Sequence, residues 1–152
     1  RERTTDGRPC GLTGRELCQA AWAGTFDAFG TQSPEDGPLI ALALGPQPDA
    51  LEGLVTPANA ACAAMLPQVD ILTAGAEVFL THGGQNSFTE ALARGTPLVV
   101  CPGAGDQVVN GDKAVALGAG LHVRRPAPLP GDEAEAAARY RADVCRALRR
   151  VA

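Results

Sequence analysis

Residues that could do chemistry gather in the stretch 76–90, around His82 and the glycine pair that follows it. The preceding run, Val78–Thr81, is apolar and partly β-branched or aromatic, which predicts a short buried strand. Gly83 and Gly84 allow the backbone to turn sharply and allow a ligand to approach it closely. His82 is therefore expected at the end of a strand, beside a turn open to a ligand.

A helix is expected directly after this turn. Ser87 and Glu90 have the spacing of a capping box, and Gly95 and Pro97 are typical residues with which to end the helix. The N–H groups of a helix start and the positive end of its dipole attract anions. The junction at His82 is thus a candidate anion site.

A second polar pair, Asp106 and Gln107, follows the next apolar run, Pro97–Cys101. The pattern predicts a strand over that run and a helix over 107–117, capped by Asp106 and ended by Gly118. A carboxylate beside an amide offers both acceptors and donors, which suits the hydroxyl groups of a sugar.

The rest of the chain supplies elements that would position these residues. Polar residues 1–11 indicate no element, and Tyr140, Val144 and Leu148 mark the buried face of the last helix. The other expected elements are strands over 39–44, 60–64 and 121–123, and helices over 15–29 after Thr13, over 69–74, and from a cap at Asp132. This alternation predicts an α/β fold with a Rossmann-like parallel sheet and helices on both faces. Ligands of such sheets bind at the carboxyl ends of the strands.

Composition narrows the function classes. The 152 residues carry a net charge of −4 without a basic stripe, which argues against nucleic acid and anionic membranes as partners. The apolar stretches are too short for a membrane span. The five cysteines are widely spaced and odd in number, so we expect free thiols in a reducing, cytoplasmic compartment. No Asp/His cluster suggests a metal. The polar start without Met leads us to expect part of a longer protein.

An ordered set of short motifs carries a family resemblance. The set comprises Pro67–Leu72, Phe79–Ser87, Glu90–Leu92, Gly95–Val100, Asp106-Gln107 and Asn110. It resembles the nucleotide-sugar signature of the UDP-glycosyltransferases, which are inverting enzymes of the GT-B fold. The resemblance spans roughly residues 38–125. It implies the C-terminal, donor-binding half of such an enzyme, with one domain in which 1–37 precede a nucleotide-sugar-binding region at 38–152.

The resemblance also implies roles for particular residues of this region. The base and ribose of UDP would be held by Met65, Gln68 and Glu90, the diphosphate by His82, Gly83, Gly84, Gln85, Asn86 and Ser87, and the sugar by Asp106 and Gln107. Plant members have Trp where Met65 stands, so aromatic stacking on the base would be lost or replaced by a thioether contact. The family's catalytic histidine lies in an N-terminal half, and no residue here corresponds to it. We therefore expect no cofactor, a UDP-sugar donor, and a small-molecule acceptor bound by an absent half or a separate chain.

Other interpretations use the same residues. Taken singly, the pair Ser87 and Glu90 fits a capping box, and Asp106 fits an N-cap, without any ligand. A dinucleotide-binding oxidoreductase would need a third glycine after Gly103-Ala104-Gly105, and the chain has no P-loop motif. The remaining alternative to a transferase is a non-catalytic nucleotide-sugar-binding module that works with an acceptor-binding chain.

Overall fold

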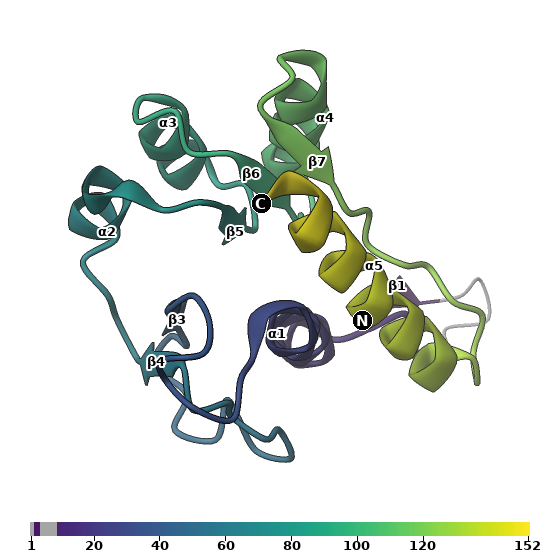
Figure 1. The fold of residues 1–152 in the computed structure, drawn as a ribbon. Helices are drawn as coiled ribbons and strands as arrows, with labels where there is room; N and C mark the ends of the chain where they lie inside the picture. Colours follow the sequence, from purple (N-terminus) through teal and green to yellow (C-terminus); the bar gives the residue numbers. More distant parts are fainter. Residues whose placement is uncertain (1, 4–8) are drawn as a thin grey trace.

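The computed structural model describes residues 2, 3 and 9–152, and Figure 1 shows their fold. The helices are α1 (Gly14–Phe29), α2 (Gln68–Gly75), α3 (Gln85–Leu92), α4 (Asp106–Ala116) and α5 (Glu133–Val151). The strands are β1 (Glu2–Arg3), β2 (Pro9–Cys10), β3 (Ile40–Ala43), β4 (Ala60–Ala63), β5 (Phe79–Thr81), β6 (Leu98–Val100) and β7 (Gly120–His122).

Three short parallel strands, in the order β5-β6-β7, form the layer that carries the site. Both faces of β6 are covered, because Leu98 and Val100 pack with residues of α2, α3 and α4 while Val99 packs with residues of α1 and α5. These three β6 side chains have no measurable exposure. The predicted α/β arrangement, parallel strands with helices on both faces, is confirmed.

The remaining strands form separate sheets. β3 pairs in parallel with β4, and β1 pairs antiparallel with β2. The prediction of no element over residues 1–11 is wrong for Glu2–Arg3 and Pro9–Cys10, whose pairing is a tertiary contact between two very short segments; residues 1 and 4–8 lie outside the described part of the chain.

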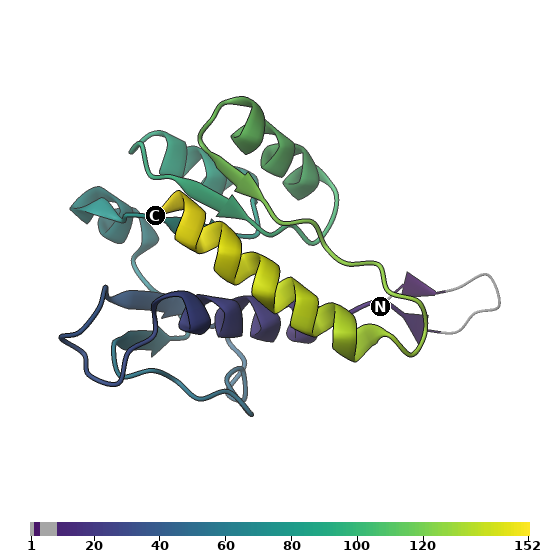
Figure 2. The same ribbon diagram turned by 45° about the vertical axis from the view of Figure 1, so that its right-hand side comes forward.

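Helices α1 and α5 lie side by side in both ribbon views (Figures 1 and 2). The guanidinium of Arg141 makes two hydrogen bonds to the carboxylate of Asp27, of 2.5 and 2.6 Å. Arg149 donates to the backbone carbonyl of Asp27 at 2.6 Å, so it satisfies a carbonyl at the end of α1. Cys101 packs in the same apolar cluster as Tyr140 of α5, and burial raises the pKa of its thiol to about 12.

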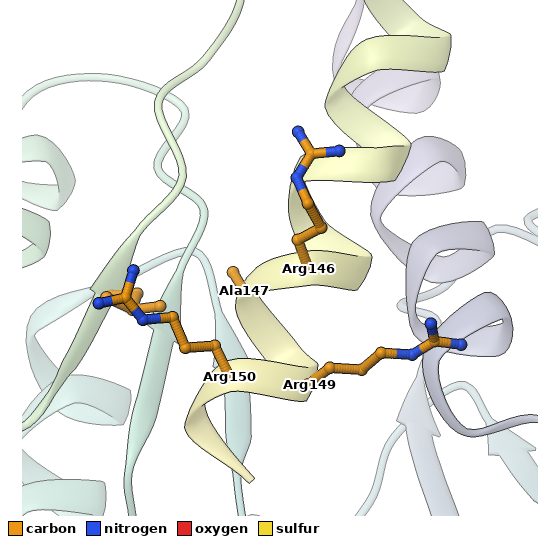
Figure 3. A pocket seen from close by; sticks show the side chains of 5 residues that line it. Arg146, Ala147, Arg149 and Arg150 are labelled. Carbon is orange, nitrogen blue, oxygen red and sulfur yellow. The ribbon is translucent and has the colours of Figure 1, made fainter.

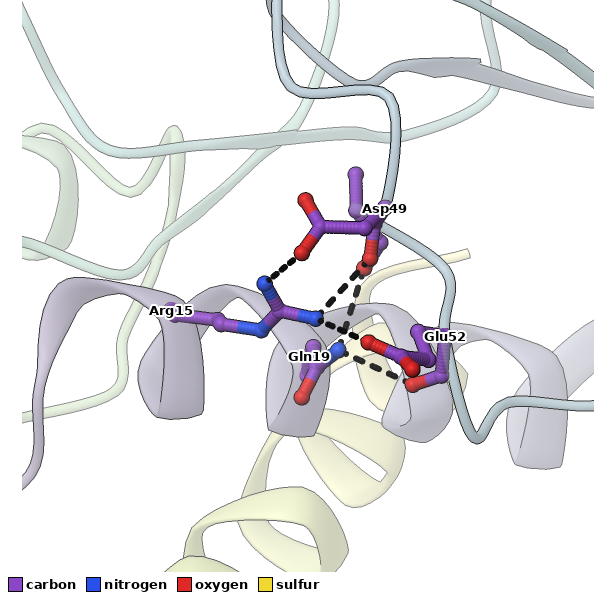
Figure 4. Close-up of polar contacts among 5 residues, drawn as sticks. Arg15, Gln19, Asp49 and Glu52 are labelled. Atoms are coloured by element: carbon purple, nitrogen blue, oxygen red, sulfur yellow. Dashed lines mark hydrogen bonds and ion pairs between the residues drawn. The ribbon is translucent and has the colours of Figure 1, made fainter.

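The long connection between β3 and β4 is tied back to α1 (Figure 4). Arg15 pairs with Asp49 and, at 3.1 Å, with Glu52. Gln19 donates to the carbonyl oxygens of Ala50 and Glu52, each at 3.1 Å. These contacts fix an otherwise irregular segment against the first helix.

Capping predictions were confirmed for one helix and failed for others. Thr13 and Glu16 form a complete capping box on α1. At α5, Asp132 occupies the N-cap position, but its side chain makes no capping hydrogen bond.

In the described part of the chain, no helix is long and apolar enough to cross a membrane. All five cysteines are free thiols, as expected.

Candidate functional site

Two glycines shape the loop between β5 and α3. Gly83 has a φ of +82°, and a Cβ there would lie 2.6 Å from Cγ1 of Val100. Its N–H donates to the hydroxyl of the buried Thr81 at 3.1 Å. A Cβ on Gly84 would lie 2.5 Å from Nε2 of His82. The imidazole therefore lies directly over the start of the helix.

The helix start itself is open. α3 begins at Gln85 with Gly84 as N-cap, and no side chain caps it. Its first N–H groups, on Gln85, Asn86 and Ser87, have no acceptor within the helix. A hollow of about 380 Å³ is lined by His82, Gly84, Gln85, Asn86 and Ser87. Five of the six residues assigned to the diphosphate thus line one hollow, and Gly83 shapes the turn behind it.

The predicted capping box of Ser87 and Glu90 is wrong. The helix begins three residues earlier than a cap at Ser87 would require, so Ser87 is its third residue and Glu90 its sixth. Instead, Nε2 of Gln68 donates to the Glu90 carboxylate at 2.6 Å and to the Ser87 hydroxyl at 3.2 Å. These three residues, from α2 and α3, form one polar group beside the hollow.

Met65 does not join this group. Its side chain is 85% exposed, and it is absent from the lining of the hollow. The structure thus unites Gln68 with Glu90 but leaves the third residue assigned to the nucleotide in solvent.

The second polar pair lies at the start of α4, next to the glycine loop. A Cβ on Gly83 would be 3.2 Å from the backbone oxygen of Gln107, which shows how closely the two segments pack. Asp106 is the first helical residue and does not cap the helix, contrary to prediction, because Gly105 occupies the N-cap with a φ of +63°. The Gln107 side-chain oxygen accepts from the N–H of Gly103 at 2.8 Å. Gln107 therefore also holds its own loop, while Asp106 is exposed.

One residue that positions the site had been given no role from the sequence. Asn110 is 3% exposed, and its side-chain amide donates to the carbonyl of Gly83 at 2.8 Å and to the side-chain oxygen of Gln85 at 3.4 Å. It joins α4 to the glycine turn. An Asn inside a predicted helix was the available signal, because Asn is a poor helix former unless its amide has a partner.

A second hollow, of about 500 Å³, lies at the end of α5 and is lined by Leu121, Arg146, Ala147, Arg149 and Arg150. Figure 3 shows its three arginine side chains pointing in different directions, so they do not converge on one ligand.

In the described residues, no three His, Cys, Asp or Glu side chains are grouped to hold a metal ion.

Comparison with known proteins gives consistent results. Residues 40–151 match the family described as erythromycin biosynthesis protein CIII-like, C-terminal domain. The chain is 47% identical over 60 residues to an uncharacterized UDP-glucosyltransferase, YojK, of Bacillus subtilis, covering 40% of this chain and 15% of that protein. It is 45% identical over 60 residues to human UDP-glucuronosyltransferase 3A1, covering 39% of this chain and 12% of that protein. The chain thus spans well under a quarter of these relatives.

Solved structures agree on the fold. The kitacinnamycin glycosyltransferase matches with a TM-score of 0.55 and 27% identity over 99% of this chain and 37% of its own. Os79 of O. sativa, solved in complex with UDP, matches with a TM-score of 0.64 and 21% identity over 95% of this chain and 30% of its own. With its family match, its UDP-glycosyltransferase relatives and the fold of a GT-B C-terminal half, the chain belongs to the erythromycin biosynthesis protein CIII-like C-terminal domain family.

Proposed function

We propose that this chain binds a UDP-sugar and positions it for transfer, with inversion, to an acceptor hydroxyl. The observation that carries the proposal is the uncapped start of α3, whose N–H groups share a 380 Å³ hollow with His82. Such a helix start binds phosphate oxygens without needing a lysine. That Os79 was solved with UDP, and that relatives are named UDP-glycosyltransferases, supports uracil as the base.

The other residues take roles that fit their chemistry. Glu90 accepts hydrogen bonds from the vicinal hydroxyls of ribose, since a carboxylate can accept two at once. Gln68 holds that carboxylate in place through its 2.6 Å hydrogen bond and faces the nucleotide. Asp106, exposed at the start of α4, accepts from the sugar hydroxyls, and Gln107 fixes the loop beside it.

Transfer is a single displacement at the anomeric carbon. The acceptor oxygen forms the new bond, its proton goes to a base outside this chain, and the bond to the diphosphate oxygen breaks with inversion. The α3 N–H groups and His82 stabilise the negative charge that develops on the departing UDP. This chain contributes orientation and leaving-group stabilisation.

The test is titration calorimetry of the purified chain with UDP, UDP-glucose and uridine, together with a transfer assay. We expect UDP to bind more tightly than uridine and no sugar to be transferred by this chain alone. Equal affinity for UDP and uridine would refute diphosphate binding at α3. Transfer to any acceptor would refute the need for a base supplied elsewhere.

The sugar assignment has its own test. Asp106→Asn removes the charge without removing a helix cap, because Asp106 does not cap α4. We expect UDP to bind this variant as it binds the parent, while UDP-glucose loses any advantage over UDP. Lys113→Gln, which removes a charge from an exposed residue of the same helix, is the control. If the affinities for UDP and for UDP-glucose fall equally, Asp106 contacts the nucleotide or supports the fold, and the sugar assignment is wrong.

A further inference from the structure

Arg125 lies in the connection between β7 and α5, three residues beyond the end of β7. Because β5, β6 and β7 are parallel, β7 ends at the same edge of the sheet as the two strands that lead into the candidate site. Figure 2 shows the connection running from the sheet toward β1 and β2 before α5 begins. Arg125 is therefore placed between the site and the segment that precedes α1.

The guanidinium of Arg125 joins two backbone segments that are far apart in the sequence. One terminal nitrogen, Nη1, donates to the carbonyl of Gly103 at 3.2 Å, and the other, Nη2, donates to the carbonyl of Leu12 at 2.8 Å. Leu12 is 1% exposed and precedes Thr13, the N-cap of α1, so its carbonyl lies outside the hydrogen-bond ladder of that helix. Arg125 thus ties the entrance of α1 to the loop that follows β6.

Gly103 belongs to residues 101–105, here called the α4 loop, which lead from β6 into α4. Both of its backbone groups bond side chains, because its N–H donates to Gln107 at 2.8 Å while its carbonyl accepts from Arg125. Asp106 follows the α4 loop directly as the first residue of α4. Two side chains thus fix the loop that sets the position of Asp106.

The residue type suits a bridge between two carbonyls. A guanidinium carries its five N–H donors in a planar fork, so it serves two acceptors at once, whereas the ammonium of lysine is one compact group on a flexible stem. Arg125 is not among the residues that line the hollow at the start of α3. Its geometry therefore fits an action through the α4 loop, without contact to the ligand.

We propose that Arg125 is a positioning residue for the donor sugar, which anchors Gly103 to the segment before α1 and so holds Asp106 where it meets the sugar hydroxyls. Because only the proposed function assigns Asp106 to the sugar, this role of Arg125 rests on that function. Arg125 then contributes to the orientation of the sugar and not to the binding of the nucleotide. A side chain that only tethers Leu12 would change stability and leave the preference between ligands unchanged.

Amide hydrogen exchange, measured by NMR on the whole chain without ligand, tests the anchoring. In Arg125→Lys the amide of Gly103 is expected to exchange about threefold faster or more, because the α4 loop opens more often, while the amide of Leu98 in β6 keeps its parent rate. Unchanged exchange at Gly103 would mean that the loop holds itself. Acceleration of both amides by the same factor would mean a general loss of stability and would also contradict the anchoring.

Calorimetric titration with UDP and UDP-glucose tests the consequence for the sugar. Arg125→Lys and Arg125→Ala are each expected to lower the ratio of UDP-glucose affinity to UDP affinity by about threefold or more, with UDP affinity itself within about twofold of the parent. Lysine keeps the charge but not the fork, so a parent-like ratio in Arg125→Lys would overturn the bridge. Arg139→Ala, which removes a guanidinium from an exposed ion pair on α5, is the control and should leave the ratio unchanged.

The same titrations separate the two levels of the proposal. A parent chain that binds neither UDP nor UDP-glucose would refute the proposed function itself. A parent chain that binds UDP, with Arg125 variants that keep the parent ratio, would overturn only the role of Arg125.

A double variant tests whether Arg125 acts through Gly103. Arg125→Ala and Gln107→Ala both release Gly103, so their combined effect on the affinity ratio should be clearly smaller than the product of the two single effects. Independent effects that multiply in full would mean that the two side chains do not share this route.

Discussion

At the scale of single residues, the site depends on a close contact between His82 and Gly84. The ring Nε2 lies where a Cβ on residue 84 would come within 2.5 Å. His82 is exposed and can swing away, whereas the neighbouring Gly83 is confined by Val100 and by a positive φ. The two glycines should therefore respond differently to the same substitution.

We expect Gly84→Ala to fold but to displace His82 from the hollow. UDP affinity should fall by about as much as in His82→Ala, for which loss of a hydrogen bond to a charged group costs ~1.5–3 kcal/mol. Calorimetry with UDP and uridine measures this, and uridine should bind both variants like the parent. If His82→Ala weakens both ligands equally, the histidine has a structural role.

Glu90 offers a second test at this scale. Glu90→Gln keeps an oxygen that can accept from Gln68, so thermal stability should change little. UDP affinity should fall because the charged acceptor for ribose is lost. The loss should be smaller for UDP lacking the ribose 2′-hydroxyl, and Glu77→Gln, on an exposed residue before β5, serves as control. Equal losses for both nucleotides would refute ribose recognition by Glu90.

At the scale of elements, α4 positions the site through a buried side chain. Asn110 connects the middle of α4 to the carbonyl of Gly83, and Gln107 holds the loop before the helix. The loop that follows β5 is thereby fixed to the helix that follows β6. Removing this link should affect the geometry of the hollow as well as stability.

Asn110→Ala leaves the buried carbonyl of Gly83 without its partner, which costs about 1–3 kcal/mol of unfolding free energy. Denaturant unfolding should show this loss, and UDP binding should weaken in the folded variant. Lys113→Ala on the exposed face of α4 should show neither effect. A stable Asn110→Ala variant with unchanged UDP affinity would mean that the turn holds its shape unaided.

At the scale of the whole molecule, α1 and α5 join the N-terminal and C-terminal parts of the described chain over one core. The pair of Asp27 and Arg141 lies on the outside of that contact, half-exposed. The nearby guanidinium of Arg141 lowers the pKa of the Asp27 carboxyl. Because the pair is exposed to solvent, its contribution is small, on the order of 0.5–1 kcal/mol.

This pair predicts a pH dependence of stability. A carboxyl whose pKa is lower in the folded state stabilises the fold above its unfolded pKa of about 3.9, and this contribution disappears as the pH falls through the folded pKa. Asp27→Asn should therefore destabilise the chain at pH 7 and lose that effect in acid. Denaturant unfolding at pH 7 and at pH 3 or below checks this, and a difference that persists unchanged in acid would contradict it.

The sequence by itself determined the local features: the helices, the strands from β3 onward, the Thr13 cap, the glycine turn after β5 and the family resemblance. These features depend on the types of side chains that lie a few residues apart, so local sequence patterns are sufficient to predict them. The sequence also led to three side-chain caps, at Ser87, Asp106 and Asp132, that the structure does not contain. At α3 and α4 a glycine occupies the N-cap position: Gly84 lies against the His82 ring, and Gly105 has a positive φ.

Only the tertiary structure decided which distant residues meet. Gln68 and Glu90 are 22 positions apart, and Asn110 and Gly83 are 27 apart. No local pattern encodes either contact, because the packing of α2, α3 and α4 on one face of the sheet brings the partners together. The division of the parallel strands into two sheets, β3-β4 and β5-β6-β7, is a property of strand pairing in space for the same reason.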